Sequence, residues 1–126
     1  CDPELWIAEA SRVLRPGGEL VFLTNAPLLM MCTAVDAAED EPATTQLLRP
    51  QFGMRAVQFP DDPDATEFHI PHGEMIDLLS RNHFTVEALI EVQAPADATT
   101  TYEFVTREWA QSWPSEEVWR ARKHAS

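Results

Sequence analysis

Residues 6–22, with the sequence WIAEASRVLRPGGELVF, decide the fold that the rest of the chain must complete. Apolar side chains such as Trp6 and Ala10 recur there at helical spacing, and the Pro-Gly-Gly at 16–18 ends the helix and turns the chain. Residues 19–25, ELVFLTN, follow with an apolar core that does not alternate, which is typical of a strand covered on both faces in a parallel sheet. The stretch therefore predicts a helix, a tight turn and a buried strand, which is half of a β-α-β crossover.

The residues before this stretch favour the same helix. Asp2 is suited to cap it, Pro3 fits the first helical position, and Glu4 complements the helix dipole. Because the chain begins at Cys1 rather than Met and enters a helix almost at once, we expect it to be the middle of a longer protein.

Composition narrows the function classes. The 126 residues include nine Lys and Arg against 21 Asp and Glu, so the net charge is −12. That acidity argues against binding to nucleic-acid phosphates or to an anionic lipid surface. Two cysteines are too few for a disulfide scaffold, and no apolar run reaches the roughly 20 residues of a membrane span. We also expect no signal peptide. We therefore expect a single partial domain, 1–126, in the cytoplasm, with neither nucleic acid nor membrane as a partner.

An acidic excursion, residues 26–70, follows the first part of the chain, 1–25. Residues 36–67 alone hold eight acidic and two basic side chains. The segments 54–59 and 66–70 have β character and flank a run of turn formers, so we expect a hairpin-like excursion rather than a disordered linker.

The last part, residues 71–126, predicts a helix, an edge strand, an irregular tail and a closing strand. Pro71 opens the helix, and its apolar face consists of Met75, Ile76, Leu78 and Leu79. The strand at 84–92 has a polar face, which indicates a position near a sheet edge, and an apolar face made of Val86, Ala88, Ile90 and Val92. Thr106 is suited to cap a short helix, and residues 118–123 predict a last strand.

Three stretches resemble class I S-adenosylmethionine-dependent methyltransferases. Residues 6–22 are similar to the helix that carries RVLRPGG and turns into the fifth strand of that family. Residues 67–92, EFHIPHGEMIDLLSRNHFTVEALIEV, look like the following helix and sixth strand of its small-molecule, type-11-like members. Residues 107–123, REWAQSWPSEEVWRARK, are similar to the closing antiparallel strand of a bacterial subgroup. The resemblance implies an α/β fold, the C-terminal half of a Rossmann-like methyltransferase sheet.

The elements that hold the cofactor in that family have no counterpart in this sequence. The family uses a Gly-rich loop after its first strand and an acidic residue that ends its second, and both precede the region that this chain resembles. The four glycines, Gly17, Gly18, Gly53 and Gly73, form no G-x-G pattern. The resemblance therefore implies S-adenosylmethionine as the cofactor of a longer enzyme that methylates a small molecule, and no cofactor-binding residue in this fragment, which we expect to be inactive alone.

Candidate substrate-binding residues are Asn25, Phe68, His69 and His72. In open α/β sheets ligands collect at the carboxyl ends of the strands, which points to Asn25. The resemblance places the excursion over the acceptor pocket, with these four residues as its wall. A histidine there can contact the substrate or act as a general base, since its pKa suits neutral pH, while capping or packing remains an alternative.

Other interpretations of the same residues stay open. Glu67, His69, His72 and Glu74 have the residue types of a zinc site, but Pro71 separates the two histidines, and we predict no metal. Cys32, in an apolar context, is predicted to be an inert buried thiol. We interpret four residues as packing rather than as a cation-binding cage: Trp6, Trp109, Trp113 and Trp119.

A function from a different class is a non-catalytic interaction module. Half of a doubly wound sheet leaves a cut edge, whose unpaired backbone groups can bind another strand. Such a module would form a homodimer or pair with another chain through this edge.

Overall fold

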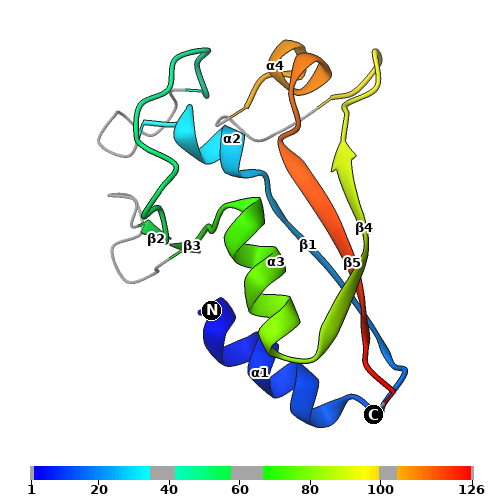
Figure 1. The fold of residues 1–126 in the computed structure, drawn as a ribbon. Helices are drawn as coiled ribbons and strands as arrows, with labels where there is room; N and C mark the ends of the chain where they lie inside the picture. The colour runs from blue at the N-terminus through cyan, green and yellow to red at the C-terminus, as the bar shows by residue number, and fades with distance from the viewer. Residues whose placement is uncertain (1, 35–41, 58–66, 100–104, 126) are drawn as a thin grey trace.

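The computed structural model describes residues 2–34, 42–57, 67–99 and 105–125 and has an α/β fold (Figure 1). Three strands form the main sheet, in the order β1-β5-β4, and two short strands form a separate pair, β2-β3. This confirms the predicted fold class. In chain order the elements are α1 (Pro3–Val13), β1 (Glu19–Asn25), α2 (Pro27–Met31), β2 (Ala56–Val57), β3 (Glu67–Phe68), α3 (His72–Arg81), β4 (Phe84–Val92), α4 (Arg107–Ser112) and β5 (Glu116–Lys123).

Strand β5 lies in the middle of the main sheet and runs antiparallel to both of its neighbours. Strands β1 and β4 therefore run parallel to each other, and their carboxyl ends lie at the same end of the sheet. The register places Phe22 of β1, Trp119 of β5 and Leu89 of β4 opposite one another. The predicted closing strand is present, but it begins at Glu116 rather than at residue 118.

The start and the end of α1 follow the sequence prediction. Asp2 caps the helix, and its Oδ1 accepts the N–H of Glu4 at 3.0 Å. After the helix, Gly17 adopts a φ of +81°, a left-handed conformation that glycine takes up at little cost. The Gly17 N–H donates to the carbonyl oxygen of Lys123 at 3.0 Å, so the turn is joined to the end of β5.

The main core lies between the sheet and two helices, α1 and α3, which cover the same face of the sheet (Figure 1). The Phe22 ring lies parallel to the Trp119 ring, with centroids 6.2 Å apart, and edge-on to Trp6, with centroids 4.9 Å apart. Helix α3 buries three of its four predicted apolar residues, and Ile76 is exposed. The buried members of the core are Ile7, Ile70, Met75, Leu78, Leu79, Phe84, Trp119 and Ala121.

The opposite face of the sheet has no covering element among the described residues. The prediction that β1 is covered on both faces is therefore wrong for this part of the chain: Val21 is 54% exposed and Leu23 is 60% exposed. On this outer face Leu23 lies beside Val118, which lies beside Ile90 of β4. An apolar row thus crosses all three strands on the side away from the helices.

A β-bulge in β4 breaks the alternation predicted for 84–92. Val86 is opposite Ala121, but Ala88 rather than Glu87 is opposite Arg120, so one extra residue is inserted at Glu87. Because side chains alternate along a strand, the insertion exchanges the two faces beyond it. Leu89 therefore packs against the core. Ile90 and Val92, which were predicted to lie on the apolar face, are exposed.

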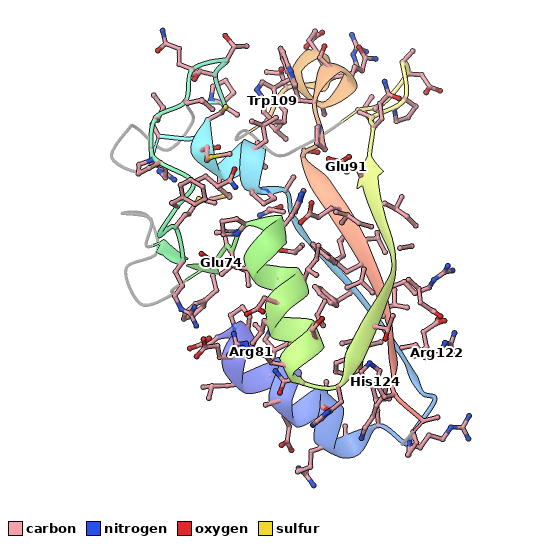
Figure 2. The ribbon with its side chains drawn as sticks, viewed as in Figure 1. Glu74, Arg81, Glu91, Trp109, Arg122 and His124 are labelled. Carbon is pink, nitrogen blue, oxygen red and sulfur yellow. The ribbon has the colours of Figure 1, made fainter. Side chains whose placement is uncertain are left out.

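The bulged residue joins a charged network on the outer face. Arg122 of β5 lies between two carboxylates, with Nε 3.0 Å from Glu87 and Nη2 2.9 Å from Glu19 (Figure 2). The Arg122 guanidinium lowers the pKa of the Glu87 carboxyl, and the Glu87 carboxylate in turn raises the pKa of Arg122. These groups are partly solvent-exposed, so each pair adds little to stability, and together they link β1, β5 and β4 at this end of the sheet.

The acidic excursion contains the short helix α2 and the pair β2-β3. Strands β2 and β3 are antiparallel, as expected for a hairpin, and Ala56 lies opposite Phe68. The turn formers at 60–64 lie outside the described residues. Beyond α2, Arg49 donates to the carbonyl oxygens of Met30 at 2.8 Å and Thr33 at 2.6 Å, which ties the following loop to the helix.

Helix α4 begins as predicted. The Thr106 hydroxyl accepts the N–H of Trp109 at 3.1 Å, and the Trp109 indole donates to the carbonyl oxygen of Thr44 at 2.8 Å. In the described part of the chain, none of the helices has the length and apolar character needed to cross a bilayer.

We expect Gly17→Ala to destabilise the chain by about 1 kcal/mol, because a Cβ strains a left-handed backbone. No neighbouring atom lies within 4 Å of the added Cβ, so the backbone conformation alone causes the loss. Gly73→Ala is the matched control: it is equally open, but it lies in α3 and has no positive φ. Urea unfolding should show a lower midpoint for the first variant and an unchanged or higher one for the second. Equal midpoints would contradict the role of the turn.

Candidate functional site

The candidate site lies where the carboxyl ends of β1 and β4 meet the beginning of β5. At this end of the sheet Thr24, Glu117 and Glu91 occupy neighbouring positions on the three strands. Helix α3 also begins here, directly after the segment that leaves β3 (Figure 1). This is the end at which open α/β sheets bind ligands.

A buried carboxylate is the central group of this site. The Glu117 side chain is 2% exposed, and one of its oxygens, Oε2, lies 2.5 Å from Nε2 of His72. The other oxygen, Oε1, accepts the indole N–H of Trp119 at 3.1 Å. Both carboxylate oxygens therefore have a hydrogen-bond partner, as a buried anion requires.

His72 connects this buried group to the surface. Its side chain is 38% exposed, and its ring lies edge-on to the Trp119 ring, with centroids 5.7 Å apart. Pro71 ends the extended segment before α3 and places His72 in the first turn of the helix. The imidazole thus contacts a buried acid and a buried indole while part of its side chain stays exposed.

The alternation of β5 explains why a carboxylate is buried here. Glu117, Trp119 and Ala121 are at every second position and point toward the helices. The sequence prediction began this strand at residue 118 and so missed Glu117. Extending the same alternation by one step would have placed Glu117 on the buried face, which is the signal that identifies it.

The four candidate residues from the sequence lie in different surroundings. His72 is bound to Glu117, as described. Asn25 is half-buried at the end of β1, opposite Glu116. Phe68 is half-buried in β3, and His69 is buried, with its backbone N–H donating to the carbonyl oxygen of Arg55 at 2.7 Å. Their assignment to an acceptor pocket stays a prediction.

The metal and cage alternatives gain no support from the described residues. They contain no group of three or more His, Cys, Asp and Glu side chains placed to hold a metal, and Glu74 is exposed on α3 (Figure 2). The Glu67 side chain lies outside what the structure describes. The tryptophans do not converge either: Trp119 packs in the main core, whereas Trp109 packs near Trp113 at α4.

Cys32 is buried beside Leu29, Ala43 and Trp109, in a small cluster under α4. Burial raises the pKa of its thiol, because the thiolate would lose its hydration. The predicted position as a buried thiol is therefore confirmed, and a high thiol pKa disfavours a nucleophilic role at neutral pH.

The sequence matches no protein-family model and no curated protein sequence. Among solved structures, a Listeria monocytogenes protein proposed to be an S-adenosylmethionine-dependent methyltransferase superposes with a TM-score of 0.64 at 16% identity. An S-adenosylmethionine-dependent methyltransferase from Mesorhizobium loti superposes with a TM-score of 0.61 at 21% identity.

This chain has the fold of part of an S-adenosylmethionine-dependent methyltransferase. The superpositions cover 94% and 97% of this chain but only 53% and 56% of the two solved chains, so it spans about half of their length. The fold predicted from the resemblance is thereby confirmed.

We expect His72 and Glu117 to be energetically coupled. His72→Ala leaves the Glu117 carboxylate with one hydrogen-bond partner and should lower the free energy of unfolding by about 1–3 kcal/mol. In a protein that already carries Glu117→Gln, the same substitution should lower it by less. A double-mutant cycle by urea unfolding at neutral pH should give a coupling of about 0.5–3 kcal/mol.

The exposed pair Asp77 and Arg81 on α3, with 3.1 Å between its charged atoms, is the matched control. Its cycle should give at most about 0.5 kcal/mol. Equal coupling in the two pairs would show that burial of Glu117 adds nothing.

Proposed function

We propose that this chain is the C-terminal part of an S-adenosylmethionine-dependent methyltransferase that acts on a small molecule in the cytoplasm. The observation that carries the proposal is the superposition of nearly the whole chain on about half of two such structures. The order of the sheet adds support, because a closing antiparallel strand is what the sequence resemblance implies.

In this proposal, the part of the enzyme present in this chain binds and orients the methyl acceptor. Asn25, Phe68, His69 and His72 come from the end of β1 and from the segment between β3 and α3. In this proposal they form the wall that orients the acceptor and excludes water. Methyl transfer is an in-line displacement, so the orientation of the acceptor is the main contribution that these residues can make.

The residues of this chain do not fit the role of a cofactor cradle. Gly17 and Gly18 lie at the beginning of β1, the opposite end of the sheet from the candidate site. Gly53 and Gly73 are exposed and belong to separate segments. S-Adenosylmethionine supplies the methyl group in the proposed reaction, and the residues that hold it would belong to the part of the enzyme that this chain does not span.

We expect the isolated 126-residue chain to bind no S-adenosylmethionine and to transfer no methyl group. Isothermal titration with micromolar S-adenosylmethionine should give no saturable heat, and circular dichroism of the same sample should show that it is folded. The complete product of the gene should bind the cofactor. Saturable binding by the isolated chain would contradict its assignment as the acceptor-side part. A complete gene product without such binding would refute the proposed function.

A second candidate function is an interaction module, and the outer face of the sheet favours it. Val21, Leu23 and Ile90 are exposed there, and the free edge of β1 pairs with none of the described residues. An exposed apolar row beside an open edge is typical of a surface that another chain covers.

The interaction module predicts self-association through β1. Light scattering coupled to size-exclusion chromatography should then show a dimer, and Val21→Lys should convert it to a monomer by placing a charge beside the edge. Ile76→Lys, on the exposed side of α3, is the control and should leave the dimer intact. A monomer at all concentrations would exclude a homodimer through this edge.

A further inference from the structure

The contact between His72 and Glu117 joins Nε2 of the ring to a carboxyl oxygen, Oε2. An ionised Glu117 can only accept, so Nε2 of a neutral ring beside it donates. A neutral imidazole has one donor and one acceptor nitrogen. The other nitrogen, Nδ1, therefore keeps its lone pair and is the basic atom of the ring.

The surroundings prevent the ring from reversing this arrangement at low cost. Glu117 is buried and cannot turn to water for a replacement donor. Its second oxygen accepts the Trp119 indole N–H, and the Trp119 and His72 rings pack at a steep angle. To turn Nδ1 toward the carboxylate, the imidazole would have to move from this position beside Trp119.

We propose that Glu117 is a positioning residue that holds His72 with Nδ1 as the proton acceptor for a hydroxyl or amine group of the methyl acceptor. The proposal rests on the proposed function and adds to it the tautomer, the accepting atom and the class of acceptor. Among the described residues, Glu117 is the one hydrogen-bond partner that the structure gives the His72 ring, and 38% of this side chain is exposed.

The proposed step moves a proton from the methyl acceptor to Nδ1 of His72. For a hydroxyl acceptor the O–H bond breaks, its electron pair stays on oxygen, and the proton forms a new bond to Nδ1. An amine acceptor reacts through its own lone pair, and an N–H bond of the resulting ammonium group then breaks in the same way. The resulting imidazolium lies beside the Glu117 carboxylate, which stabilises the positive charge without itself becoming protonated. Glu91 lies opposite Glu117 on β4, and Glu116 precedes Glu117 on β5, so acidic side chains gather at this end of the sheet.

The same charges indicate which acceptors fit. An acceptor that arrives as an anion has no proton to give and meets a net charge of −12. An acceptor that arrives neutral, with a hydroxyl or amine hydrogen, can give a proton to His72. The imidazolium that forms then compensates the negative charge of Glu117. The site therefore favours neutral X–H acceptors, such as phenols or enols, over carboxylates and phosphates.

The tautomer can be measured on the 126-residue chain itself. Two-bond nitrogen–proton correlation spectra should show His72 with a protonated Nε2 and an unprotonated Nδ1, with the signals assigned by His72→Gln. Glu117→Gln should change this into a mixture of tautomers. Glu87→Gln removes a carboxylate that lies on the outer face and should leave the spectrum of His72 unchanged.

An Nδ1-protonated ring, or an unchanged tautomer in Glu117→Gln, would overturn the proposal. If Glu117→Gln does not fold, Glu117→Asp provides the second test, because it keeps the charge but withdraws the oxygens from Nε2. A tautomer unchanged in that variant would overturn the proposal equally.

The complete gene product provides the functional test. With phenol-type acceptors, Glu117→Gln should lower kcat by about 10- to 100-fold, move its pH profile and leave the KM for S-adenosylmethionine unchanged. Wild-type kcat in that variant would overturn the positioning role while leaving the proposed function intact. A parent protein without methyl transfer to any acceptor would instead overturn the proposed function, and with it the role of Nδ1.

Discussion

The pairing of β5 with both β1 and β4 is the constraint on which the rest of the structure depends. Strands β1 and β4 are separated by about half of the chain and contact each other only through β5 in the described sheet. Trp119, in the middle of β5, contacts Phe22 on one side, the His72 ring on another and the Glu117 carboxylate along its own strand. The C-terminal residues therefore join the core, the sheet and the candidate site.

Much of this fold could be predicted because local signals were strong. The Asp2 cap and the Pro-Gly-Gly turn are short-range features whose physics does not depend on distant residues, and both formed as expected. The covering of β1 could not be predicted in the same way. An unbroken apolar strand shows that both faces favour burial, but it does not show whether the covering element belongs to the same stretch of chain.

The errors in the two other strands have different origins, an inserted residue in β4 and a starting residue placed too late in β5. A period of two makes each face assignment depend on every residue before it, so a single insertion reverses the pattern. In β4 the extra residue, Glu87, is stabilised by Arg122, a partner 35 positions away that no local pattern reveals. In β5 the starting residue was placed too late, and Glu117 was lost from the candidate site although His72 was included.

The position of Glu117 is informative because it is unfavourable for a strand of this kind. Its neighbours on the buried face are Trp119 and Ala121, and an apolar side chain would extend that face without a desolvation cost. A buried ion pair is often no more stable than apolar residues of similar volume, so stability alone does not account for a carboxylate there. The carboxylate does something that an apolar residue cannot: it forms a hydrogen bond to the partly exposed His72 imidazole, at the end of the sheet where open α/β folds bind ligands. On this argument the energetic cost of burying Glu117 is better explained by its contact with His72 than by a gain in stability.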